Sequence, residues 1–234
     1  ACLGGITPPA TAFLTAIQFL LICFYVHKVS FLFHGEKNYA RFSLFALLSS
    51  SLFFFAVFLG QETGWTALSA AMFFYYALKM KNNESITAST IMLSLSASIG
   101  ALSREYGPIF AAMIPLALPF FNIPRKNIAI AFSIAAAMSS PFYLMNFFVN
   151  GNPFYPLSVP GGFLPYNEIY HGLLSEYSRH FGVFANPSLL IVSLKILIFS
   201  APLQMLAFFC AFGNFSKNKI FYFYVIAIFA MWLY

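Results

Sequence analysis

Long apolar segments constrain the fold of this chain more than any other feature of its sequence. A helix that crosses a bilayer needs about 20 consecutive, mainly apolar residues, and the chain contains about eight segments of that kind. Backbone groups in lipid must form their hydrogen bonds within the segment, and runs such as IAIAFSIAAAM do not alternate as barrel strands do. We therefore expect an all-α, polytopic membrane helical bundle with about eight transmembrane helices. The expected helices cover residues 9–26, 41–60, 64–79, 86–103, 107–123, 127–149, 188–212 and 220–234.

The composition excludes an ordinary soluble domain. Of the 234 residues, 61% are hydrophobic and 8% are charged, whereas a soluble domain carries about 25% charged residues. The formal net charge is +6, but the basic residues are scattered singly or in pairs, which indicates membrane topology and no nucleic-acid partner. Cys2, Cys23 and Cys210 lie far apart, without a Cys/His cluster. We therefore assign no metal-ligating residues and expect neither a zinc site nor a disulfide framework.

The distribution of basic residues predicts the orientation of the helices. Alternate connections contain nine of the 12 Lys and Arg residues, and the positive-inside rule makes these connections cytoplasmic. The cytoplasmic connections are residues 27–41, 79–85, 123–127 and 214–219. The outward-facing connections are residues 60–64, 103–107 and 150–187. We expect an integral multi-pass protein of a prokaryotic cytoplasmic membrane, with the endoplasmic reticulum as the alternative.

The chain is expected to form a single, partial transmembrane domain over residues 1–234. It begins without Met and stops within an apolar run, which indicates a piece of a longer polypeptide. Residues 150–187 form an external loop in which two acid–histidine pairs each share a helix face. The pairs are Glu168 with His171 and Glu176 with His180. Their spacing matches no strong metal motif, so we favour an interfacial amphipathic helix over a metal site.

Charged side chains at two outward-facing span ends are the candidates for chemistry. Glu62 lies in GQETGW at the start of a span, where the helix dipole stabilises a carboxylate by about 0.3–1 kcal/mol. A functional alternative is a carboxylate that orients an acceptor hydroxyl. In LSREYGP, Arg104 supplies a planar fork suited to phosphate, and Glu105 is placed to hold or neutralise it. The structural alternative is an interfacial ion pair whose side chains reach toward water.

Four stretches of the chain resemble a known family of membrane enzymes. They are GGITPPATAFLTAIQFLLICFYVHKV, GQETGWTALSAAMFFYYAL, ALSREYGPIFAAMIPLAL and PFYLMNFFVNGNPFYP. Together they are similar to the GT-C-type glycosyltransferases, especially the dolichyl-phosphate-mannose-type protein mannosyltransferase superfamily. The family's acidic first external loop has no counterpart, the chain contains no Asp, and Met145 stands where the family often has Arg. Either the catalytic Asp lies upstream of Ala1, or this relative has lost activity.

The resemblance implies a GT-C-like fold and a glycosyltransferase with an outward-facing site. Its donor would be a sugar linked to a polyprenyl phosphate, and its acceptor a protein, lipid or glycan. Glu62 would assist catalysis, Arg104 would bind the lipid phosphate, and Glu105 and Tyr106 would line the pocket. No cofactor is assigned, and a requirement for a divalent cation stays open. The bilayer is an expected partner, and a membrane-protein complex is a further one.

Two other functions remain as alternatives. A multi-pass transporter or channel would suit the composition, although its usual internal repeat is not evident and the charges lie at span ends. A non-catalytic membrane subunit derived from the same family would explain the missing Asp. Recovery of the residues before Ala1 separates the enzyme from the subunit, because only the enzyme needs an acidic external loop there.

Overall fold

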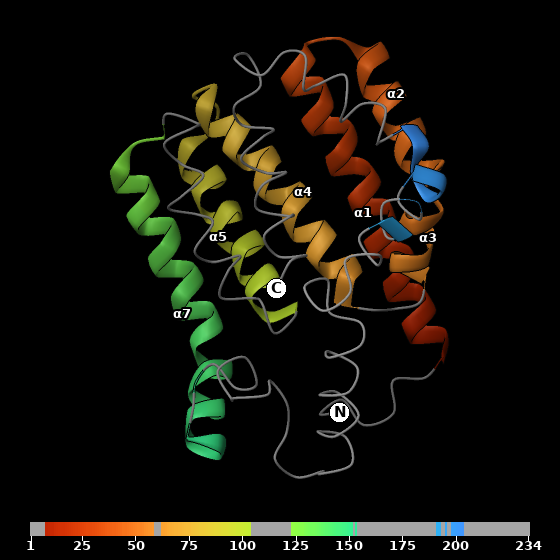
Figure 1. Ribbon diagram of the computed structural model, residues 1–234. Coiled ribbons are helices and arrows are strands. Elements are labelled where there is room, and N and C mark those ends of the chain that lie inside the picture. The colour runs from red at the N-terminus through yellow and green to blue at the C-terminus, as the bar shows by residue number, and fades with distance from the viewer. Residues whose placement is uncertain are drawn as a thin grey trace. The chain divides into compact units, whose positions relative to one another are not determined.

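The fold of the described residues is helical throughout. A computed structural model describes residues 8–58, 62–103, 123–151, 153, 191–192, 195 and 198–203. Within these residues the regular elements are helices, and no strand occurs (Figure 1). The helices are α1 (Pro8–His34), α2 (Lys37–Leu48), α3 (Ser51–Phe58), α4 (Glu62–Lys81), α5 (Ile86–Ser103) and α7 (Arg125–Asn150). The chain divides into two compact units, residues 1–138 and 139–234, with the boundary inside α7.

Three of the described helices are long and apolar enough to cross a membrane. They lie at Ala12–His34, Ile86–Ser103 and Arg125–Val149. These helices correspond to the spans predicted at 9–26, 86–103 and 127–149, and the limits predicted for 86–103 match α5. The spans predicted at 107–123 and 220–234, and most of the span at 188–212, lie outside the described residues. The total of about eight spans therefore stays a prediction.

Large apolar side chains cover the outside of these helices. Phe13 and Leu20 of α1 are 66% and 64% exposed, and Phe148 of α7 is 79% exposed. Many large apolar side chains exposed along a helix are unfavourable in water and indicate contact with lipid or another apolar partner. The three apolar helices and their exteriors together indicate a membrane protein.

The first connection, which the sequence predicts at residues 27–41, is shorter in the structure. Residues 27–41 were expected to form a loop, but α1 continues to His34 and α2 already begins at Lys37. Gly35 ends α1, because its φ of 75° is in the left-handed region and its N–H donates to the Phe31 carbonyl at 2.8 Å. A glycine in this conformation closes a helix without the steric cost that a side chain would add.

The span predicted at 41–60 is divided into α2 and α3 by a break at Ser49 and Ser50. Ser49 Oγ donates to the Ala46 carbonyl at 2.8 Å, and Ser50 Oγ accepts the Phe53 N–H at 3.3 Å. Ser50 therefore acts as the N-cap of α3, a position that serine favours. A helix can be interrupted at membrane depth where serine hydroxyls bond the freed backbone groups. Hydropathy alone cannot detect this break, because both halves are apolar.

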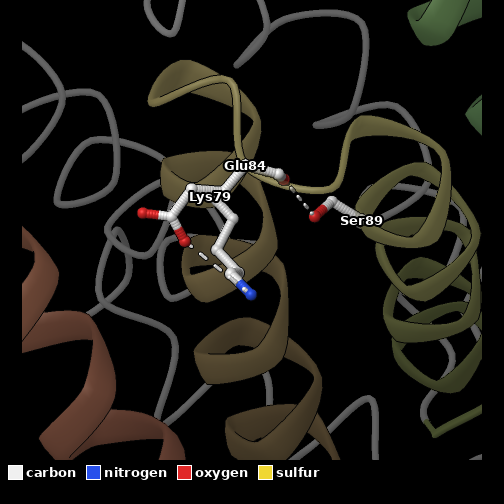
Figure 2. Close-up of polar contacts among 3 residues, drawn as sticks. All are labelled: Lys79, Glu84 and Ser89. Atoms are coloured by element: carbon white, nitrogen blue, oxygen red, sulfur yellow. Dashed lines mark hydrogen bonds and ion pairs between the residues drawn. The ribbon is translucent and has the colours of Figure 1, made fainter.

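The turn between α4 and α5 is held by backbone and side-chain bonds. Asn83 has a φ of 58° and donates its N–H to the Met80 carbonyl at 3.0 Å, while the Glu84 N–H donates to the Lys79 carbonyl at 2.9 Å. This pair of bonds is a Schellman motif, in which Asn is an accepted left-handed residue. Figure 2 shows the Glu84 carboxylate beside Lys79, 3.8 Å from Nζ, and the Glu84 carbonyl accepting from Ser89 Oγ at 3.2 Å. The turn makes α4 and α5 antiparallel neighbours.

Helix α4 lies between α1 and α5 and contacts both along much of its length. On one side, a core cluster joins α1, α3 and α4. Its buried members are Ile22, Tyr25, Phe53, Val57, Leu68 and Met72. On the other side, Ser69 Oγ of α4 donates to the Ser96 carbonyl of α5 at 2.6 Å. Ser96 and Gly100 are both buried, so this pair of small residues in α5 forms part of a packing surface.

Candidate functional site

The first turn of α4 and the last turn of α5 meet at the predicted outward-facing end of the helices. Thr66 Oγ1 of α4 and Ser103 Oγ of α5 are hydrogen-bonded at 2.9 Å. Ser103 is also the residue immediately before Arg104, and Thr66 is one helical turn after Glu62. The structure therefore brings together the two chain segments from which the predicted site residues emerge.

The predicted site residues are described to different extents. Glu62 is the first residue of α4, as the sequence predicts for an acid at a span boundary, but its side chain lies outside the description. Arg104, Glu105 and Tyr106 follow the last described residue of α5 and also lie outside it. The described part of this region therefore consists of the residues that flank them.

Gln18 of α1 is a buried polar residue beside the start of α4 that the sequence reasoning did not identify. Its side chain is 2% exposed, and its Nε2 has no hydrogen-bond partner among the described residues. The amide lies against Gly64 in the first turn of α4, where a Cβ would stand 2.5 Å from Gln18 Oε1 and 2.9 Å from Nε2. The sequence does distinguish Gln18 in one respect, because it is the single amide side chain in the apolar run of α1.

Gly64 permits the close approach of α1 to α4. Carbon atoms essentially never stand closer than 3.0 Å to the amide atoms of another side chain, so a residue with a Cβ at position 64 would displace Gln18. The neighbouring Trp65 is 37% exposed. Small residues at helix interfaces in membranes allow backbones to approach in this way. The glycine thus positions the amide at the start of α4.

The polar groups at this end of α4 suit the binding of an oxygen-rich ligand. The first four N–H groups of a helix have no partner within the helix, and the dipole makes that end positive. The hydroxyls of Thr66 and Ser103 lie at this end of the helices, and Glu62 begins α4 one turn before Thr66. Ser103 Oγ is also 2.9 Å from the Gly100 carbonyl, which fixes the hydroxyl in the last turn of α5.

The remaining candidates are those for metal binding. Over the described residues, no group of three or more His, Cys, Asp or Glu side chains could hold a metal ion. The acid–histidine pairs at 168–180 lie outside the description. Comparisons of the chain with protein-family models, curated protein sequences and solved structures found no match.

Proposed function

We propose that this chain is the membrane part of a glycosyltransferase that moves a sugar from a polyprenyl-phosphate-linked donor to a protein, lipid or glycan acceptor. The observation that carries the proposal is the Thr66–Ser103 hydrogen bond, because it links the helix that Glu62 begins to the helix that Arg104 follows. The resemblance to GT-C-type enzymes supports the same assignment. The membrane would be a prokaryotic cytoplasmic membrane, with the site on its outer face.

The proposed chemistry needs a cation and a carboxylate at neighbouring positions. Lipid phosphate is the leaving group, and Arg104 stabilises the negative charge that develops on it. Glu62 assists by orienting the acceptor hydroxyl. Glu105 holds the arginine, and Tyr106 lines the pocket. Each of these roles requires the two helix ends to be adjacent, which the hydrogen bond between Thr66 and Ser103 supports.

The test is transfer from a radiolabelled polyprenyl-phosphate sugar by the full-length protein in liposomes. We expect Arg104→Ala to abolish transfer while the protein still inserts and elutes as a single species. Arg125→Ala is the matched control, because Arg125 is an exposed arginine at a helix end on the predicted cytoplasmic side. Full activity of Arg104→Ala would remove this residue from the mechanism. Absence of transfer with every donor would overturn the proposed function.

A transporter is the second candidate, and the break between α2 and α3 is the observation in its favour. Discontinuous helices often form the substrate sites of transporters. Here, however, Ser49 and Ser50 already bond the Ala46 carbonyl and the Phe53 N–H at the break, so these groups are not free for a substrate. Uptake of a solute into liposomes without sugar transfer would favour this candidate over the enzyme.

A further inference from the structure

Helix α2 packs one side against α1 and leaves the opposite side exposed (Figure 1). Ser43 Oγ of α2 lies 2.8 Å from Ser30 Oγ of α1, and this hydrogen bond fixes the side of α2 that faces α1. Ala40 and Ala46, three residues before and after Ser43, are buried on the same side. The residues on the other side of the helix therefore form its exposed face.

The exposed face of α2 is cationic at its start and apolar along the rest of its length. Lys37 and Arg41 are exposed in the first two turns. Phe42 and Phe45 follow with 54% and 63% of their surface exposed, and Leu48 ends the helix with 36% exposed. Arg41, Phe45 and Leu48 are four and three residues apart, so they form one row along the helix. A row with a cation at one end and apolar side chains beyond it matches an amphiphile with an anionic headgroup.

Aromatic contacts indicate that the start of α2 lies at the level of the lipid headgroups. The centre of the Tyr39 ring lies 4.9 Å from that of the His34 ring, and Tyr39 is 51% exposed. Tyrosine is enriched where a membrane meets water, because its ring is apolar and its hydroxyl is polar. His34 is also the last residue of a helix that is long and apolar enough to cross a membrane. Lys37 and Arg41 stand on either side of Tyr39 in the sequence, so their long side chains can reach the phosphates at this level.

We propose that the exposed face of α2 binds an anionic phospholipid, with its phosphate at Lys37 and Arg41 and an acyl chain along Phe45 and Leu48. The planar guanidinium of arginine matches the oxygens of a phosphate. The exposed Glu36 precedes the two cations and opposes an anionic headgroup, so this corner of the protein carries one net positive charge. Lipid binding at this face does not rest on the proposed function.

A second copy of the chain is a less suitable occupant of this face. Two copies in one bilayer have the same orientation, so a symmetric contact through α2 would place Arg41 opposite its own counterpart at the same depth. Like charges in such a position repel each other. A phospholipid instead brings a negative charge to the cations and an apolar chain to the phenylalanines.

Quenching of a tryptophan by brominated lipids measures which lipid lies against α2. Trp65→Phe and Trp232→Phe remove the two native tryptophans, and Phe45→Trp places a reporter on the exposed face. The full-length protein is reconstituted in mixtures of phosphatidylglycerol and phosphatidylcholine, in which one lipid or the other carries bromine on its acyl chains. We expect phosphatidylglycerol to bind beside the reporter about fivefold more tightly than phosphatidylcholine. If Phe45→Trp does not purify, Phe42→Trp serves as the reporter on the same face.

Charge variants of α2 should change this preference in opposite directions. Arg41→Gln should abolish the preference for phosphatidylglycerol, whereas Glu36→Gln should raise it by about threefold. Glu36 is the N-cap residue of α2 but makes no side-chain capping bond, so its replacement removes no cap. Arg125→Gln is the matched control, because Arg125 is an exposed arginine at the start of α7, and it should leave the preference unchanged.

Each outcome decides for or against this lipid site. Opposite effects of Arg41→Gln and Glu36→Gln, with no effect of Arg125→Gln, would support it. Equal quenching by the two lipids would show that lipid covers α2 without selection of its headgroup, which would overturn the proposal. Quenching by neither lipid would show that protein covers the face, and recovery of quenching on dilution with excess lipid would identify that protein as a second copy. A preference that survives Arg41→Gln would also overturn the proposal.

Discussion

Replacement of Gly64 by alanine tests the close approach of α1 to α4. The new Cβ would stand 2.5 Å from Gln18 Oε1 and 2.7 Å from Cδ, so the amide must move within a site where it is 2% exposed. Overpacking of this kind costs about 1–3 kcal/mol. The amide is the end of a flexible side chain, which places the cost in the lower half of that range.

A second effect of the substitution has the opposite sign. Alanine is up to about 1 kcal/mol more favourable than glycine within a helix, and we take about 0.5 kcal/mol for the first turn. Gly64→Ala alone should therefore destabilise the protein by about 0.5–1.5 kcal/mol. In a Gln18→Ala background the obstructing amide is gone, so the same substitution should stabilise the protein by about 0.5 kcal/mol. The two backgrounds should thus differ by about 1–2 kcal/mol.

The assay is the free energy of unfolding in mixed micelles, followed by circular dichroism while the fraction of SDS is raised. Gly35→Ala is the control, because its φ of 75° makes alanine unfavourable there for reasons that do not involve Gln18. Its cost of about 1 kcal/mol should be the same in both backgrounds. If Gly64→Ala stabilises the protein equally with and without Gln18, the helices do not approach as the structure shows.

Three further outcomes follow from the described contacts. Tyr25→Phe removes the 3.2 Å bond between the Tyr25 and Tyr76 hydroxyls and should lower the free energy of unfolding by about 1 kcal/mol. The double variant Tyr25→Phe/Tyr76→Phe should lose no more than the single variant, and additive losses would contradict the bond. Ser50→Ala removes the cap on the Phe53 N–H and should cost about 1 kcal/mol, whereas an unchanged unfolding curve would argue against a capped break. Glu84→Cys, in a chain without its native cysteines, should react with a membrane-impermeant maleimide only when the reagent reaches the cytoplasmic side. If the reagent labels this cysteine in intact cells, the predicted orientation of the helices is wrong.

The sequence alone predicts which charged residues lie at the span ends, but not which span ends are close together. Glu62 and Arg104 stand out in the sequence because charged residues are rare beside apolar spans, and their positions relative to the spans are local properties. The proximity of the two helix ends from which they emerge depends on the antiparallel pairing of α4 and α5, which the Asn83–Glu84 turn and the Thr66–Ser103 bond establish. Sequence spacing alone, which separates the two segments by a complete pair of spans, does not show that contact.

The sequence by itself determined the helical class, the membrane environment and the limits of α5, since apolar length and backbone hydrogen bonding are properties of each segment alone. Only the tertiary structure decided where the predicted span at 41–60 breaks, because Ser49 and Ser50 resemble any other small polar pair until their bonds are seen. It also decided that Gln18 lies against Gly64. The packing of a single amide in an apolar run depends on which helix lies next to it, and hydropathy does not identify that helix.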